Sequence, residues 1–570
     1  MKADKQIIYQ TFPRLFGNYT EYPVRNGSKE VNGCGKFNSY TVKALAGIQE
    51  LGITHIWYTG VLAHSTGTDY SSWGIPSDHQ AIVKGKAGSP YAIKDYYDVD
   101  PDLAERVSDR MNEFVALVRR THDAGMKVII DFVPNHVSRS YRSLMKPVNI
   151  SDIGQDDNKS VAFSPFNNFY YLPGQTLNLH LREEEVGKFY TSPYPLKRGN
   201  INSQIYTEFP AKVTGNDCFT ANPGIHDWYD TVKLNYGVDY LHGGATYFSP
   251  IPDTWHKMLH ILLYWVEKDI DGFRCDMAEM VPISFWSWAI PQVKKQKNVL
   301  FIAEIYNPSR YQEFIQTGRF DFLYDKSGVY DLLRDIMGRQ SSIWSLKEHL
   351  QRVEPMIDSL LFFLENHDEQ RIASNFFAGD ALAAIPALIF MMTYRTNPVM
   401  IYNGQEVGEK GMDNEGFSGL DGKTSIFDYW RMDSIRRWAN VGCFDGGLLN
   451  ETEKSLRLLY KRILTLAVEE KALSMGLFYS LDNTPDQVLA FLRKYGNELI
   501  LVSINFSKHP IHTRIKIPKE AFDILQIPDN KVSMMKELLS DEENICSLTH
   551  TCPFQTTLSE QSAKIYKLTY

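Results

Sequence analysis

Asp131-Phe-Val-Pro-Asn-His136 is the first of four similar stretches in this chain, followed by Gly272-Phe-Arg-Cys-Asp276, Phe301-Ile-Ala-Glu304 and Leu364-Glu-Asn-His-Asp368. Each has a run of β-forming residues that leads into polar residues, which is typical of the carboxyl end of a buried parallel strand. In a barrel of parallel strands these ends share one rim, and catalytic residues lie on that rim. The four stretches therefore predict one site built from acids, Asn and His.

The rest of the chain alternates between strand-like and helix-like segments. Residues 107–124 carry apolar side chains at helical spacing, and residues 456–468 predict the last helix of the series. Eight strands with helices between them predict an α/β fold, a (β/α)8 TIM barrel. The expected strands are residues 6–12, 53–58, 127–132, 272–276, 299–304, 320–324, 359–364 and 398–402.

Two segments break the barrel rhythm. Residues 137–245 are rich in Asn, Gly, Pro and Tyr, and a structureless loop of that length is unusual in a compact domain. We expect an inserted domain there (domain B), which divides the catalytic barrel (domain A) into residues 1–136 and 246–475. From residue 476 short strands and turn residues predict a C-terminal all-β sandwich domain (domain C), residues 476–570.

The composition excludes several classes of protein. Hydrophobic residues make up 43% of the chain and charged residues 22%, which is ordinary for a soluble globular protein. The net charge of -8 argues against nucleic acid as the partner, because a phosphate binder usually needs a basic face. No secretory leader and no run of 18 apolar residues is visible, so we expect a cytoplasmic protein that does not enter membranes. The six cysteines show no Cys-x-x-Cys spacing, so no metal site is predicted.

The acids at the strand ends suit cleavage of a glycosidic bond, which needs a proton donor and a carboxylate facing the developing positive charge. Arg274 and Asp276 are two residues apart on one strand and should share a face. The guanidinium should then lower the pKa of Asp276 and keep it ionised, as a nucleophile requires. Glu304 follows an apolar run, which favours the protonated form of a general acid. Asp368 stands beside His367, a donor that could hold sugar hydroxyls.

Each of these residues alone has a simpler reading. An Asp after a strand is more often a helix cap or an ion-pair partner, and a lone Arg is more often structural. Single His residues such as His136 and His367 are more often satisfied core or surface groups. Their convergence on successive strands of one barrel favours a functional site.

The four stretches resemble the four signature regions of the α-amylase family, glycoside hydrolase family 13. The long insert, the Tyr402-Asn-Gly-Gln-Glu406 ending of the last strand and the C-terminal β-domain agree with this resemblance. It implies a retaining double displacement through a covalent β-glycosyl-enzyme. In that scheme the catalytic residues are Asp276 as nucleophile, Glu304 as acid and then base, and Asp368 as the brace of the distorted ring, while Tyr91, His136, Arg274 and His367 bind the substrate sugar.

The chain departs from the family pattern in two places. Typical α-amylases carry Lys-His three and four residues after the nucleophile, whereas this chain has Glu279-Met280. The family motif Pro-Asp-Leu-Asn is best matched by Val232-Lys-Leu-Asn235, so Lys233 puts a cation where an Asp often serves a structural calcium ion. Asn135 remains as one oxygen ligand, but hard cations need several oxygens. We therefore expect no required cofactor and no metal ligand, and a structural Ca2+ is disfavoured.

The sequence thus predicts an intracellular retaining α-glycoside hydrolase that cleaves α-1,4-glucosidic bonds in malto-oligosaccharides or related α-glucans. Two alternatives stay open: an α-glucan transglycosylase or isomerase on the same site, and a catalytically silent sugar-binding protein on the same fold. The only expected partner is the oligosaccharide or α-glucan substrate. Chain-length preference, endo or exo action, activity on α-1,6 bonds or trehalose, and oligomeric state are left open.

Overall fold

The chain folds into a closed barrel of eight parallel strands. The computed structural model describes residues 5–179, 206–339, 341–482 and 484–570. The strands close in the order β1-β16-β15-β14-β13-β12-β5-β2, and every neighbouring pair is parallel. All eight strands expected from the sequence are confirmed. Their bounds are β1 Ile7–Thr11, β2 His55–Tyr58, β5 Lys127–Phe132, β12 Gly272–Cys275, β13 Leu300–Ala303, β14 Phe322–Tyr324, β15 Leu360–Phe363 and β16 Val399–Tyr402.

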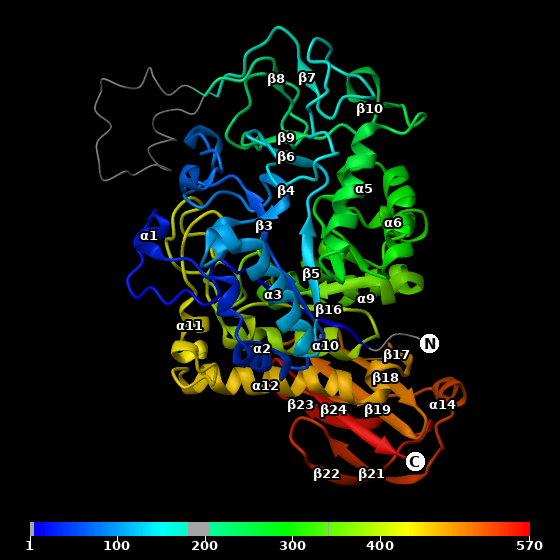
Figure 1. Ribbon diagram of the computed structural model, residues 1–570. Helices are drawn as coiled ribbons and strands as arrows, with labels where there is room; N and C mark the ends of the chain where they lie inside the picture. The colour runs from blue at the N-terminus through cyan, green and yellow to red at the C-terminus, as the bar shows by residue number, and fades with distance from the viewer. Residues whose placement is uncertain (1–4, 180–205, 340, 483) are drawn as a thin grey trace.

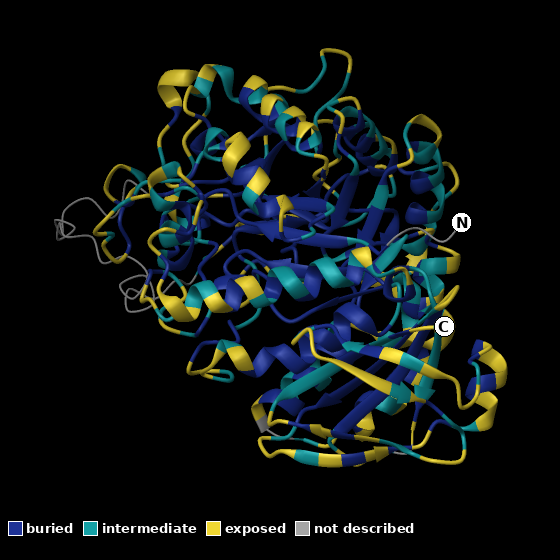
Figure 2. Ribbon diagram, turned by 90° about the horizontal axis from the view of Figure 1, so that it is seen from below, coloured by how far each residue is buried: buried dark blue, intermediate teal, exposed yellow. Residues whose placement is uncertain are grey.

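Helices surround the barrel and bury its outer face. The segment predicted from residue 107 forms a short 3-10 turn, Val107–Asp109, followed by α3, Arg110–Asp123. The predicted last helix is α12, Glu451–Glu469, which begins at an Asn450 cap reinforced by Glu453. Figure 2 shows the buried barrel strands inside a shell of helices with exposed outer faces. The other helices of the ring are α2 Val42–Gln49, α5 Asp253–Val266, α6 Ile283–Gln296, α7 Tyr311–Gln316, α8 Asp331–Arg339, α9 Trp344–Val353, α10 Ile385–Thr393 and α11 Asp433–Ala439.

Large side chains fill the barrel interior, as expected for a packed core of this fold. Trp57, Tyr324 and Phe363 come from three different strands and are all fully or almost fully buried. Arg274 Cζ lies 5.2 Å from the Trp57 ring centroid and 5.5 Å from that of Tyr324. The aromatic layer therefore forms the floor on which the one buried guanidinium of β12 rests.

The insert between β5 and α5 lies over the carboxyl ends of the strands, at the top of Figure 1. Its described part contains three small antiparallel pairs. The first pair begins at His136, shortly after β5 ends at Phe132, and ties the insert to the barrel rim. The pairs are β6 His136–Ser138 with β9 Thr231–Lys233, β7 Tyr171–Leu172 with β8 Ala211–Lys212, and β10 Val238–Asp239 with β11 Ala245–Thr246.

The C-terminal domain is an antiparallel β-structure below the barrel (Figure 1). Its six-stranded sheet has the order β17-β18-β19-β24-β21-β22, and a second sheet pairs β20 with β23. One short helix, α14 Lys519–Leu525, lies among the strands. Arg493 joins the domain to the barrel, because its buried guanidinium donates to the carbonyls of Thr393 and Tyr394 at the end of α10. The strands are β17 Leu477–Leu481, β18 Val488–Tyr495, β19 Glu498–Asn505, β20 Ile511–Ile515, β21 Val532–Glu537, β22 Glu543–Ser547, β23 Phe554–Leu558 and β24 Ser562–Thr569.

The boundaries between domains A, B and C, expected at residues 136/137, 245/246 and 475/476, stay predictions from the sequence. Among the described residues, no helix combines the length and the apolar character that crossing a bilayer would require.

Candidate active site

One open pocket lies at the carboxyl ends of the barrel strands. It brings together five of the seven predicted site residues, which had been expected on one rim. The remaining two, Arg274 and His367, lie beneath its floor, with side chains no more than 1% exposed. The pocket is lined by Tyr91, His136, Asp276, Glu304 and Asp368, together with Lys84, Ser89, Trp228, Asp230, Thr231, Met277, Tyr306, Ile426 and Phe427.

Arg274 holds the two central carboxylates on one guanidinium. Its Nη1 lies 2.6 Å from Asp276 Oδ1, and its Nη2 lies 2.7 Å from Glu304 Oε1. Asp131, at the end of β5, is a third acid near the same group, with 3.7 Å between Nη1 and Oδ1. The expectation that the side chains of Arg274 and Asp276 point the same way is confirmed by this contact, although β12 ends at Cys275 and Asp276 is the first residue after it. Two carboxylates on one fixed cation are held in a defined relation to each other.

The electrostatic setting of Asp276 differs from the expectation. Burial raises the pKa of Asp276 well above its ordinary range, and Glu304 adds to the rise, although Arg274 acts in the opposite direction. The prediction that Arg274 would keep this pKa low was therefore wrong, because the cost of removing the carboxylate from water exceeds the gain from one ion pair. Asp276 Oδ2 accepts no hydrogen bond from the described residues. Asp276 is one of the residues that line the pocket, where a nucleophile needs to be.

Glu304 is surrounded by donors rather than by apolar groups. Oε1 accepts a hydrogen bond from Tyr306 Oη at 2.9 Å in addition to its ion pair with Arg274. Oε2 accepts from the backbone nitrogen of Met277 at 2.7 Å. The apolar residues before Glu304 lie inside β13 and pack in the barrel wall, so the reason given for a protonated Glu304 does not hold. Its assignment as general acid stays a prediction that rests on its place in the pocket.

The predicted sugar-binding residues form a connected group. Tyr91 Oη lies 2.6 Å from His367 Nε2, and the two rings stack with centroids 5.2 Å apart. Gln10 on β1 contacts the other ring nitrogen of His367 at 2.8 Å. Burial lowers the pKa of His367 well below its ordinary value, and burial with Lys84 and Lys233 nearby lowers the pKa of His136 to about 3. Both imidazoles are therefore neutral at pH 7.

Asp368 is the most accessible of the three predicted catalytic acids. Its side chain is 41% exposed, and its Oδ2 lies 3.1 Å from His367 Nε2. The backbone nitrogen of Asp368 donates to Asn366 Oδ1 at 2.8 Å, which fixes the turn that follows β15. A carboxylate held by the backbone but open to the pocket can accept hydrogen bonds from a bound sugar.

The sequence reasoning missed Asp131, which is buried beside Arg274, and several residues that line the pocket. Asp131 was quoted in the first stretch but not selected; its pKa is raised to about 6 by burial, although Arg274 and the Gly60 nitrogen act against the rise. Tyr306 stands two residues after Glu304, a spacing that could have indicated it. Trp228 and Asp230 had no strand-end signal, because they lie in a loop of the insert whose position only the fold determines.

Glu279, which stands where typical α-amylases carry a Lys, makes structural contacts. Its Oε2 accepts from the backbone nitrogens of Tyr306 and Asn307, at 3.0 and 3.3 Å. The side chain therefore links the turn after β12 to the loop after β13, and it holds the loop from which Tyr306 reaches Glu304.

The residues at the expected calcium position do not fit a metal ion. Lys233 Nζ donates to Asn135 Oδ1 at 3.1 Å and lies 2.5 Å from Asp217 Oδ1. The ammonium thus uses the oxygen that a calcium ion would need. Across the described ranges, no three His, Cys, Asp or Glu residues are grouped so that they could hold a metal. The absence of a required metal stays a prediction.

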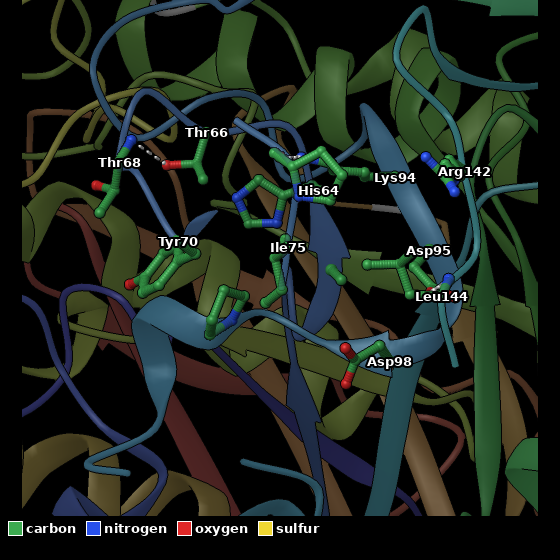
Figure 3. A pocket seen from close by; sticks show the side chains of 13 residues that line it. His64, Thr66, Thr68, Tyr70, Ile75, Lys94, Asp95, Asp98, Arg142 and Leu144 are labelled. Carbon is green, nitrogen blue, oxygen red and sulfur yellow. Dashed lines mark hydrogen bonds between the residues drawn. The ribbon is translucent and has the colours of Figure 1, made fainter. Parts of the chain in front are cut away.

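A second hollow, drawn in Figure 3, lies beside the antiparallel pair of β3, Leu62–His64, and β4, Ile93–Val99. Its volume of about 20 Å³ is enough for a single water molecule. Asp95 in its wall accepts from Ser143 Oγ and from the backbone nitrogens of Leu144 and Met145. These satisfied contacts indicate a structural role for this hollow.

Comparisons with known proteins agree with this architecture. The family description "Alpha amylase, catalytic domain" matches residues 22–440. Alpha-amylase 3 of Dictyoglomus thermophilum is 24% identical over 489 residues, which cover 79% of this chain and 80% of that protein. A cyclomaltodextrinase of Thermoanaerobacter pseudethanolicus is 23% identical over 528 residues, which cover 89% and 71%.

Solved structures show the same fold at low identity. The alpha-amylase of Geobacillus thermoleovorans complexed with acarbose has a TM-score of 0.63 and 19% identity, covering 100% of this chain and 98% of that one. AmyP in complex with maltose has a TM-score of 0.61 and 17% identity, covering 99% and 96%. Since the family description spans most of the 570 residues, the chain belongs to the alpha-amylase family and is an alpha-amylase-type glycoside hydrolase.

Proposed function

We propose that the chain is a retaining hydrolase that cleaves α-1,4-glucosidic bonds in malto-oligosaccharides or related α-glucans. The observation that carries the proposal is the placement of Asp276 and Glu304 on the two ends of one buried guanidinium, facing the same pocket. A retaining site needs two carboxyl groups about 5–5.5 Å apart, close enough for direct capture of the sugar.

The first chemical step forms the covalent intermediate. Asp276 Oδ2, which has no hydrogen bond to lose, attacks the anomeric carbon of the sugar. The bond from that carbon to the glycosidic oxygen breaks, and Glu304 transfers its proton to the departing oxygen. Asp368 accepts hydrogen bonds from hydroxyls of the same sugar ring. The neutral imidazole of His136, which lines the pocket, can hold a hydroxyl without adding charge, whereas His367 acts through Tyr91 and Asp368, the two pocket residues that it contacts.

The second step releases the sugar. Glu304, now ionised, takes a proton from a water molecule, whose oxygen attacks the anomeric carbon and displaces Asp276. Arg274 pairs with both carboxylates and so stabilises the charge as it moves between them. If another sugar enters in place of water, the same step gives transfer.

The substrate range is tested by product analysis. Relatives are named alpha-amylase, cyclomaltodextrinase, neopullulanase and intracellular maltogenic amylase, so maltoheptaose, starch, β-cyclodextrin and pullulan form the panel. We expect reducing sugar from maltoheptaose and its loss in Asp276→Asn. Products longer than the substrate would assign the chain to transfer, and binding without any product would assign it to sugar binding alone.

We also propose a cytoplasmic location. All six cysteines are free thiols in the described structure, which fits a reducing compartment. Fractionation of the native cells, with detection by antibody, tests the location; recovery from the culture medium would overturn it.

A further inference from the structure

An ion pair crosses the wall of the pocket between the barrel and the insert. Lys84 lies in the loop before β4, and Asp230 directly precedes β9 of the insert. Lys84 Nζ is 3.0 Å from Asp230 Oδ1. Both side chains line the same pocket as Asp276 and Glu304, although nothing in the mechanism above uses them.

Asp230 has acceptor capacity that the described part of the protein does not use. The residue is 1% exposed, yet neither carboxylate oxygen accepts a hydrogen bond from any described residue. Buried polar atoms nearly always have hydrogen-bond partners, because an unsatisfied acceptor carries its full desolvation cost. Oδ1 is paired only with the Lys84 ammonium and Oδ2 has no partner among the described residues, so the carboxylate has room for a ligand that brings its own donors.

A second buried Lys–Asp pair shows how a structural ion pair looks in this chain. Lys94 Nζ is 2.9 Å from Asp78 Oδ2. Asp78 also accepts from the backbone nitrogen of Thr66 at 3.1 Å and from Ser140 Oγ at 2.6 Å. Both oxygens of Asp78 are therefore satisfied by the protein, whereas the Asp230 carboxylate has Lys84 as its one partner among the described residues.

The loop that carries Asp230 is held firmly. The backbone nitrogen of Arg139 donates to the Asp230 carbonyl at 3.1 Å, and Arg139 Nε donates to the Tyr229 carbonyl at 2.5 Å. The guanidinium of Arg139 is itself fixed by Glu208 at 2.7 Å. Trp228 has a positive φ of 41°, a backbone conformation that side-chain-bearing residues rarely adopt. The position of the Asp230 carboxylate is thus fixed before any ligand arrives.

Aromatic rings flank the ion pair. The Trp228 ring lies 5.2 Å from the His136 ring, and Lys84 Nζ is 6.0 Å from the centroid of Phe427. Lys84 is also one of the charges that lower the pKa of His136, which places the pair on the His136 side of the pocket. A carboxylate, an ammonium and aromatic faces together match a sugar, which offers adjacent hydroxyls and apolar ring faces.

We propose that Lys84 and Asp230 form a sugar-binding subsite on the His136 side of the pocket. Asp230 accepts hydrogen bonds from two adjacent hydroxyls of one glucose unit, and Lys84 donates to an oxygen of the same unit. The proposal rests on the proposed function above and adds to it the residues that determine how an α-glucan chain is held.

Binding of maltotriose to the uncleaving Asp276→Asn protein tests the subsite. Titration calorimetry should show binding about 10- to 100-fold weaker when Asp230→Asn is added, the worth of a hydrogen bond to a charged group. Lys84→Met should weaken binding in the same range. The matched control Lys94→Met, at the satisfied pair, should leave the affinity within twofold.

Lysine acetylation tests the same subsite without a substitution at Lys84 or Asp230. Maltotriose added to the Asp276→Asn protein should slow acetylation of Lys84 several-fold, as read by mass spectrometry, and leave Lys94 unchanged. Equal affinity in folded Asp230→Asn and its parent, or no protection of Lys84 by bound sugar, would overturn the subsite. Failure of the unmutated protein to cleave any member of the panel would count against the proposed function and not against the subsite.

Discussion

Replacing Arg274 by Met tests whether one guanidinium neutralises the acids of the pocket. The side chain is fully buried and lies on the aromatic floor, with Asp276 and Glu304 at 2.6 and 2.7 Å. Met is unbranched and close to Arg in volume but carries no charge, so it fills much of the space and leaves these carboxylates without their cation. Arg274→Met therefore tests mainly the loss of the positive charge and only to a smaller extent the loss of packing.

The expected loss of stability is large. Removing one partner of a buried ion pair costs about 3–5 kcal/mol, because the remaining charge stays buried and uncompensated. Since two carboxylates lose the same partner, we expect at least about 4 kcal/mol at pH 7.5. That is a substantial part of the ~5–15 kcal/mol that holds an ordinary protein folded.

The penalty should depend on pH in a defined direction. The pKa of Asp131 is raised to about 6 and that of Asp276 is raised well above its ordinary range, and in both cases Arg274 opposes the rise. Without Arg274 both values rise further. A carboxyl whose pKa is higher in the folded than in the unfolded chain stabilises the fold at low pH and loses that contribution as pH rises. The Arg274→Met penalty should therefore be small near pH 4.5 and grow as pH rises past 6.

Urea unfolding followed by tryptophan fluorescence at pH 4.5 and pH 7.5 measures the penalty. Adding Asp276→Asn to Arg274→Met should restore about 1–3 kcal/mol at pH 7.5, since one uncompensated charge disappears. Arg371→Met is the matched control, because Arg371 is equally buried and pairs with Glu365 at 2.9 Å outside the pocket. Asp276→Asn should not rescue that control. A penalty below about 1 kcal/mol, equal values at both pH values, or no rescue would refute the reasoning.

Three further predictions concern the acid, the cation and the pocket wall. Glu304→Gln should lose about 10²–10⁴-fold on maltoheptaose and far less on aryl glycosides with good leaving groups, which need little acid help; equal losses in steady-state assays would contradict the role. EDTA should leave the melting temperature nearly unchanged, whereas Lys233→Met should lower the free energy of unfolding by about 1–3 kcal/mol; a large drop with EDTA in calorimetry would restore the calcium site. Gly215→Ala would place a Cβ 2.9 Å from His136 Cβ, so kcat/KM should fall on the order of 10- to 100-fold with little change in circular dichroism.

The sequence was sufficient for the barrel and for the rim residues because both follow from local patterns. The β-forming runs before Asp131, Asp276 and Glu304 predict strand ends, and parallel strands bring those ends together whatever the loops do. Lys84 and Asp230 could not be found this way. Their meeting depends on how the insert folds back through the β6–β9 pair, a contact that spans about a hundred residues and has no local signal.

The pKa of Asp276 could not be predicted from its neighbours in the sequence, although its contact with Arg274 could. Strand alternation correctly predicted the contact with Arg274, but the sign of a pKa shift depends on every neighbour and on exclusion of water. Desolvation and Glu304 together exceed the effect of the guanidinium, and neither can be judged from a pentapeptide. Ionising the nucleophile in this pocket is therefore costly. A developing positive charge on the sugar would relieve that cost in the transition state, which is where an enzyme gains rate from an electrostatically strained ground state.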